Sequence, residues 1–220
     1  LGRGVDAGEF TANLTRLLDA AEKAAGPTIL ALQEIDEADA PDEHRILAES
    51  AGLRFKVASP STAVPILVQR RLRVVRSRVS FAAPGLARVT PHRVVTITVC
   101  DLPGIDWLPR IVALNTHLPR DLLSTRGRRA MVRARLRAAA TWHVVRGRIV
   151  VWMADTNTHA SFPQMMPREH TIGGHGIDII RLSVPRHIKA TVIKRRRINL
   201  TIDGHDAHLA TVNFQPKEKP

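Results

Sequence analysis

The chain has 220 residues and a formal net charge of +13, from 33 lysines and arginines against 20 aspartates and glutamates. Its length and its 44% hydrophobic content suit one globular α/β domain with a sizeable core. A single cysteine, Cys100, excludes an internal disulfide framework, and the longest apolar runs, residues 29–32 and 149–154, are too short to span a bilayer.

The positive charge has two explanations. A basic surface favours contact with polyanions such as nucleic acid or anionic lipid headgroups. A GC-rich coding sequence would produce the same arginine- and alanine-rich chain without tyrosine. Because the first residues carry no apolar leader and no residue pattern requires an oxidising compartment, we expect a cytoplasmic protein without membrane insertion, and we expect a monomer.

A helix followed by a buried strand is predicted near the N-terminus. Leucines recur at helical spacing over residues 9–25, and Gly26 and Pro27 end the pattern. Residues 28–35 form a short continuous apolar run that is typical of a covered strand, and this run ends at Gln33 and Glu34. Further strands are predicted at residues 53–58, 64–69, 74–81, 94–100 and 111–115.

One other long helix is predicted, at residues 125–145, with His143 on its apolar side. On this helix Arg129, Arg133 and Arg137 form a stripe at i, i+4 spacing. The stripe could contact a phosphate backbone, but charged stripes usually form the solvated face of an amphipathic helix, and we assign it so.

The remaining residues complete a single domain over residues 1–214. Strands are predicted at 149–154, 177–182, 198–202 and 208–214, the basic cluster 194–197 is assigned to a turn, and residues 215–220 to a disordered tail. The spacing of His159, His170 and His175 matches no compact zinc pattern, so we interpret them as loop residues. Many strands with few helices indicate a two-layered sheet core flanked by helices.

Polar residues recur where the predicted strands end, which is where sheet-based active sites are commonly assembled. Glu34 ends the strand TILALQEI, His117 follows IVALNT, Asp155 and Asn157 follow IVVWMA, Asp178 opens IDII, and His205 precedes the last strand.

The motifs LQE, NTHL, ADTN, GIDII and HDAHLATV occur in the order expected for the endonuclease/exonuclease/phosphatase family, which the chain resembles over nearly its whole length. The resemblance implies a deoxyribonuclease I-like, four-layered α/β sandwich of two packed, mainly antiparallel sheets flanked by helices. It also implies phosphoester hydrolysis, with Glu34 as a ligand of Mg²⁺ or Mn²⁺ and with Asp155 and Asn157 matching the GDxN element of the family.

The chemistry of these side chains fits that reaction. Asp155 would orient or deprotonate the attacking water, and Asn157, expected to point the same way along an extended segment, would donate to a phosphate oxygen. His205 would donate to the phosphate with its ring held by Asp178, and His117 would be a second donor. Each residue alone also has an ordinary structural explanation in a turn or at a strand end, and their joint order favours function.

The resemblance has two departures. Family members usually begin with a strand that ends in a metal-binding asparagine, whereas Asn13 falls inside the first predicted helix and cannot replace it. Where the family usually reads Ser-Asp-His, this chain has Gly204 before His205. The neighbouring Asp203 and Asp206 are alternative replacements for the displaced carboxylate, and we take Asp203 as the second candidate metal ligand. We therefore expect reduced rather than absent activity.

Three functions are compatible with these residues. The first is a Mg²⁺-dependent nuclease that acts on DNA or RNA, because the hydrolase motifs coincide with a basic chain. The second is a small-molecule or lipid-headgroup phosphatase of the same fold, since the fold does not determine what the surrounding loops select. The third is a degenerate member of the fold that binds nucleic acid without cleaving it.

Overall fold

The computed structural model describes residues 6–35, 43–59, 63–85, 92–118, 126–157, 163–202 and 205–217. The helices and strands follow the chain in the order α1 (Ala7–Glu22), β1 (Ile29–Ala31), α2 (Glu43–Ala51), β2 (Phe55–Val57), β3 (Ile66–Gln69), β4 (Arg73–Ala83), β5 (Arg93–Asp101), β6 (Ile111–His117), α3 (Arg126–Val145), β7 (Ile149–Asp155), β8 (Glu169–His175), β9 (Asp178–Ser183), β10 (Ile188–Ile202) and β11 (His205–Pro216).

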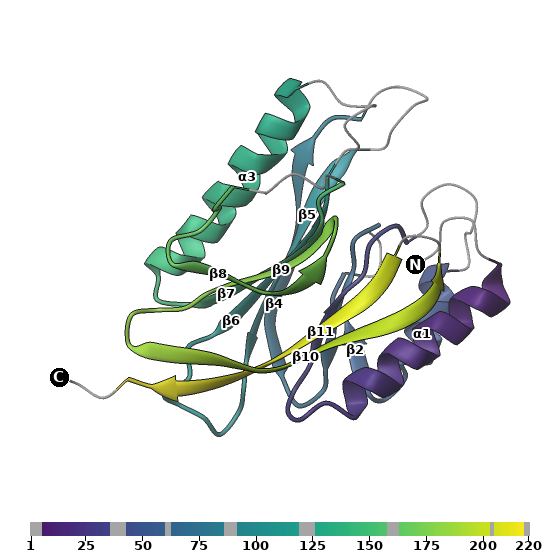
Figure 1. Cartoon of the computed structure of the whole chain (residues 1–220), viewed down its shortest axis with the longest axis horizontal. Helices are drawn as coiled ribbons and strands as arrows, with labels where there is room; N and C mark the ends of the chain where they lie inside the picture. The colour runs from purple at the N-terminus through teal and green to yellow at the C-terminus, as the bar shows by residue number, and fades with distance from the viewer. Residues whose placement is uncertain are drawn as a thin grey trace.

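The strands form layers between helices, as Figure 1 shows. The largest sheet has six strands in the order β4-β5-β6-β7-β9-β8, and only the β6–β7 pair in it is parallel. A three-stranded sheet, β1-β3-β2, and the β10–β11 hairpin lie between this sheet and α1, while α3 covers the opposite face. The expected fold of two mainly antiparallel sheets flanked by helices is confirmed.

Two apolar clusters hold the layers together. On the α3 side, Val132 and Leu136 pack with Leu114 and Trp152 of the six-stranded sheet. On the α1 side, the helix packs against the smaller sheet and the hairpin through a cluster that includes Phe10, Leu14, Leu18, Leu30, Ile198 and Leu200. Complete burial of one such side chain stabilises the fold by roughly 1.5–3 kcal/mol. None of the described helices has the length and hydropathy that a membrane span requires.

The basic cluster 194–197 is not a turn. It lies inside β10, where Lys194 pairs with Thr211 and Arg197 pairs with His208 of β11. Side-chain contacts compensate for the low strand propensity of these charged residues, because Arg195 Nε donates to Ile172 O at 2.8 Å and Arg197 forms an ion pair with Asp206.

The tail begins later than predicted, because β11 continues through Pro216. The amide of Lys217 donates to His187 O at 2.8 Å, so the neighbouring pair Ile188–Pro216 is a non-hydrogen-bonded one. A proline fits there because its missing N–H removes no bond of the ladder. Residues 218–220 lie outside the described residues.

Two other expectations need correction, and helix α2 had no sequence prediction. The histidines His170 and His175 belong to strand β8 and not to a loop, while His159 lies outside the described residues. The arginine stripe of α3 is not uniformly solvated either: Arg137 is exposed, but Arg129 is only 8% exposed and donates to Thr156 O at 3.2 Å.

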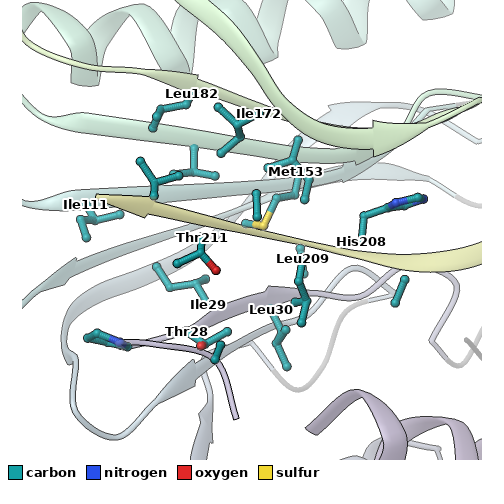
Figure 2. Close-up of a pocket in the computed structure, with 18 of the residues that line it drawn as sticks. Thr28, Ile29, Leu30, Ile111, Met153, Ile172, Leu182, His208, Leu209 and Thr211 are labelled. Atoms are coloured by element: carbon teal, nitrogen blue, oxygen red, sulfur yellow. The ribbon is translucent and has the colours of Figure 1, made fainter. Parts of the chain in front are cut away.

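An apolar cavity of about 440 Å³ separates β1 from β11, and Figure 2 shows side chains that line it. It is bordered by consecutive residues of both segments, 26–34 and 206–214, and by Met153 and Ile180 of the large sheet. A run of consecutive residues indicates that the strands present their edges to the cavity, because residues of one face would alternate. Among the described residues no strand lies between these edges.

Candidate active site

One end of this cavity is acidic, and a buried histidine lies beside it. The cavity reaches Glu34, Asp155, Asp178 and Asp206. The Nε2 atom of His117 lies 3.7 Å from Glu34 Oε1 and 3.5 Å from Asp155 Oδ2. The side chain of His117 is 3% exposed, that of Glu34 is 13% exposed and that of Asp155 is 5% exposed. The structure therefore brings together three of the residues predicted from sequence, which come from the end of β1 and the carboxyl ends of β6 and β7.

The protonated nitrogen of His117 follows from its other neighbour. The NH1 group of buried Arg93 lies 3.2 Å from Nδ1 of His117. A guanidinium can only donate, so Nδ1 accepts and the ring proton is on Nε2. This Nε2 atom is the one that lies 3.5 Å from the Asp155 carboxylate and 3.7 Å from the Glu34 carboxylate, and His117 can thus act as a hydrogen-bond donor beside the acidic end of the cavity. Sequence reasoning did not identify Arg93.

Asp155 and Asn157 are linked by a turn rather than by an extended segment. Strand β7 ends at Asp155, and Asn157 has a φ of 48°, in the left-handed region that asparagine tolerates. The backbone N–H of Asn157 donates to Asp155 Oδ1 at 2.7 Å, and the side-chain Nδ2 of Asn157 donates to Leu118 O at 2.7 Å. The expectation that both side chains point the same way along a strand is therefore wrong. These bonds instead fix the orientation of the Asp155 carboxylate.

Glu34 is held in place by a residue of the other sheet. Its backbone has a φ of 58°, which is unusual for a residue other than glycine. The side chain of Asn115, fully buried in β6, donates to the carbonyls of Leu32 at 2.7 Å and Pro65 at 2.9 Å, and it accepts from Gln33 Nε2 at 2.7 Å. These three bonds connect the turn that contains Glu34 to the strand that carries His117.

A second histidine, His208, lines the cavity itself. It extends from β11 near Leu209 in Figure 2. Burial lowers the pKa of His208 below its ordinary value, and the charges of Asp178 and Asp206 act in the opposite direction. Asp178, which is paired with Asp155 across β7 and β9, thus interacts with His208.

The residues predicted in the last motif are only partly described. The backbone of His205 begins β11, but its side chain lies outside the described structure, and so does the whole of Asp203. The sequence nevertheless contained a signal for His208, because Asp206-Ala207-His208 repeats the spacing of Asp203-Gly204-His205 three residues later.

The donor atoms at the acidic end suit a hydrated divalent cation. Within the described part of the chain, no group of three or more histidine, cysteine, aspartate or glutamate side chains forms a compact metal site. Mg²⁺ needs no such cage, since it retains several waters and usually takes only one or two protein carboxylates. Glu34, a partly exposed carboxylate at the edge of the cavity, offers the hard oxygen ligand that this cation prefers.

Comparison with solved structures places this geometry in a known fold. No family model and no curated protein matches the chain. A Bacteroides vulgatus endonuclease/exonuclease/phosphatase superposes with a TM-score of 0.70 at 14% identity, covering 94% of this chain and 91% of the other. TDP2 from D. rerio, in complex with a single-stranded DNA product, gives 0.67 at 15%, covering 96% and 94%. A mannosyl-6-phosphatase from Bacteroides thetaiotaomicron gives 0.62 at 10%, covering 94% and 92%.

The match to TDP2 from Caenorhabditis elegans is less complete. The chain is 18% identical to it, with a TM-score of 0.57 and 86% of the chain covered, and it spans 64% of the length of that protein. The chain thus has the deoxyribonuclease I-like fold of the endonuclease/exonuclease/phosphatase proteins.

Proposed function

We propose that this chain is a divalent-cation-dependent phosphoesterase that hydrolyses phosphodiester bonds of nucleic acid by the attack of water. The observation that carries the proposal is the grouping of His117 with the carboxylates of Glu34 and Asp155 at the ends of three strands. All three are buried or nearly so, and a desolvated cluster of titratable groups on a cavity is the kind of arrangement that active sites use.

Asp155 is the residue best suited to act on the water. Its Oδ1 accepts from the Asn157 backbone amide, which holds the carboxylate in a fixed orientation on the cavity, where it can orient a water and accept its proton. His117, with its proton on Nε2, donates a hydrogen bond to a non-bridging phosphate oxygen as negative charge develops there. The side-chain Nδ2 of Asn157 donates one N–H to Leu118 O, and its second N–H would donate to a phosphate oxygen.

Glu34 is the residue proposed to hold the cation, and Asp203 remains the second candidate ligand. When bound, Mg²⁺ would neutralise charge on the phosphoryl group and assist the departing oxygen. In the chain itself, Asn115 and Gln33 keep the Glu34 turn at a fixed distance from His117.

His208 takes the role that sequence analysis gave to His205. It lines the cavity and interacts with Asp178 and Asp206, and these carboxylates can orient its ring toward the phosphate. Burial lowers the pKa of His208 and the charges of Asp178 and Asp206 oppose this effect. A ring that donates one N–H to a carboxylate and the other to the phosphate is the protonated form, which these two carboxylates favour.

A substrate panel tests the proposal. Labelled single- and double-stranded DNA, a matching RNA and p-nitrophenyl phosphate are incubated with the chain in Mg²⁺, in chelator, and in chelator followed by excess Mg²⁺. We expect oligonucleotide cleavage that stops in chelator and returns with the cation. Absence of cleavage by the folded chain for every substrate and cation would contradict the proposal and favour a protein that binds nucleic acid without cutting it.

A small-molecule phosphatase is the second candidate, supported by the similarity to the mannosyl-6-phosphatase structure. Salt distinguishes the two functions. Binding of a nucleic acid backbone releases counterions and weakens steeply as salt increases, whereas turnover of a small soluble phosphoester depends on salt only weakly. Preferred turnover of phosphomonoesters that is insensitive to salt would therefore favour the phosphatase.

A further inference from the structure

A second cavity, of about 590 Å³, lies on the opposite face of the six-stranded sheet, between α3 and strands β4 and β5. Its floor includes Ile97, Val99 and the side chain of His143. Its walls carry guanidinium groups from four separate segments of the chain, namely Arg76, Arg78, Arg110, Arg135, Arg146 and Arg148. We refer to this site as the arginine cleft.

The arginine cleft is positively charged without local compensation. Of the aspartates and glutamates that the structure describes, none lines it. Within the described part of the chain, none of its six arginines forms an ion pair, and Asp101, whose charge interacts with Arg110, is already bound by Arg73 through two hydrogen bonds of 2.7 and 2.9 Å. Clustered like charges destabilise a folded chain, and an anion that binds between them removes this repulsion.

Two titratable groups in the cleft respond to this charge. Burial, followed by the charges of three arginines of the cleft, lowers the pKa of His143 to about 4. Burial, followed by the charges of Arg110 and Arg146, also lowers the pKa of Arg148. The guanidinium groups of Arg78, Arg110, Arg146 and Arg148 therefore interact with one another or with His143 and are not independent surface charges.

An aromatic ring lies among these charges. Trp142 is 54% exposed, unlike Trp152, which is buried in the core, and the Arg146 guanidinium carbon lies 3.9 Å from the centre of its ring. Guanidinium groups bind phosphates through paired N–H donors, and an exposed aromatic ring between them offers a surface on which a base can stack. A simple anion such as inorganic phosphate would make no use of the ring.

We propose that the arginine cleft binds a segment of single-stranded nucleic acid, with backbone phosphates on the arginines and one base stacked against Trp142. The cleft is distinct from the candidate active site. Arg110 and Arg148 precede β6 and β7, whereas His117 and Asp155 end these strands, so the two sites lie about 20 Å apart at roughly 3.3 Å per residue. The assignment goes beyond the proposed hydrolysis and does not depend on it.

Binding of a fluorescein-labelled 12-nucleotide oligothymidine, followed by anisotropy in chelator, tests the proposal without any cleavage. The variant Arg135→Gln/Arg146→Gln removes two charges from the cleft, and Arg16→Gln/Arg196→Gln removes two exposed arginines elsewhere. Glutamine keeps the helix propensity at position 135, and Arg146 lies in the turn that follows α3. We expect the cleft variant to bind the oligothymidine about tenfold more weakly. The slope of log K against log salt should decrease in magnitude by roughly 1.4, because each lost phosphate contact removes about 0.7. The affinity of the control variant should change by less than about twofold.

Trp142→Ala tests the base contact, and we expect it to weaken oligothymidine binding about tenfold without changing the salt slope. Inorganic polyphosphate serves as an anion without bases, and its affinity should not change in this variant. Equal weakening by the two double variants would overturn the proposal. Oligothymidine binding that is unchanged in Trp142→Ala and no tighter than polyphosphate binding would also overturn it, in favour of a general polyanion site.

Discussion

The side chain of Asn115 accepts a hydrogen bond of 2.7 Å from Gln33, and through this contact the six-stranded sheet fixes the turn that carries Glu34. Asn115 is fully buried and also donates to Leu32 O and Pro65 O. The separation between His117 and Glu34 therefore depends on one amide that takes no part in the proposed chemistry.

Asn115→Ala should weaken both the fold and the cation site. It leaves two carbonyls without their buried donor, which costs about 1–3 kcal/mol in unfolding free energy. Loosening of the Glu34 turn should raise the Mg²⁺ concentration for half-maximal hydrolysis about tenfold or more. Urea unfolding and a Mg²⁺ titration measure the two effects. Asn199→Ala, at an exposed position of β10, is the control and should change stability by less than about 0.5 kcal/mol.

Gly174→Ala should displace the β8–β9 hairpin and with it Asp178. Gly174 has a φ of +108°, and a Cβ atom there would lie 2.2 Å from Asp178 O. We expect a loss of stability of at least about 2 kcal/mol, together with reduced activity. Gly127→Ala is the matched control, because a Cβ at Gly127, in helix α3, meets no atom within 4 Å. Alanine is the better helix former, so this change should keep or raise the thermal midpoint. Equal losses of stability in Gly174→Ala and Gly127→Ala would contradict the proposed clash between a Cβ atom at position 174 and Asp178 O.

Stability should decrease in mild acid because of His143. Its pKa is about 4 in the folded chain, against an ordinary value near 6.5, so the unfolded chain binds more protons between these values. The contribution of His143 to the free energy of unfolding is therefore complete above about pH 6.5 and is lost as the pH falls toward 4. Urea midpoints measured between pH 7.5 and 4.5 should show this decline, and it should be smaller in His143→Gln. Identical pH profiles for the two chains would contradict the assignment.

Cys100 should be inert in the folded chain. Its thiol is fully buried, and burial raises its pKa to about 12, so almost no thiolate forms at pH 8. A disulfide reagent such as dithionitrobenzoate should react with one thiol per chain in 6 M guanidinium and with essentially none under native conditions. Rapid stoichiometric reaction of the native chain would show that the β4–β5–β6 region opens readily.

The two histidines of the last motif can be separated by substitution. His208→Ala should reduce hydrolysis by about two orders of magnitude, because it removes the histidine that lines the cavity. His205→Ala should leave most of the activity. The reverse order of effects, in chains with unchanged circular dichroism, would return the role to His205.

Much of the fold was predictable because buried strands such as β5, β6 and β7 are short continuous apolar runs. Prediction failed where pairing or packing overrode local composition. The basic residues 194–197 form a strand because β11 pairs with them, and Arg129 is buried because α3 packs over the end of β7. Short helices such as α2 carry too few apolar residues to show a period.

The candidate site was predictable from motif order, but its supporting contacts were not. Glu34, His117 and Asp155 were predicted from sequence and lie together. Arg93 and Asn115 act through contacts between distant segments, and no sequence spacing indicates them. The proposal of His208 rests on the position of the cavity, because both histidines have the same local pattern and the side chain of His205 lies outside the described structure.

If the cluster of Glu34, His117 and Asp155 hydrolyses phosphodiesters, the cleavage rate of Asp155→Asn must decrease. The control is Asp106→Asn, which makes the same chemical change at an exposed position. With Mg²⁺ and labelled DNA, Asp155→Asn should lose activity at least about a thousandfold while its unfolding midpoint stays near that of the parent chain, and Asp106→Asn should cleave at the parent rate. Cleavage by Asp155→Asn at the parent rate would place the hydrolytic centre elsewhere and contradict the claim.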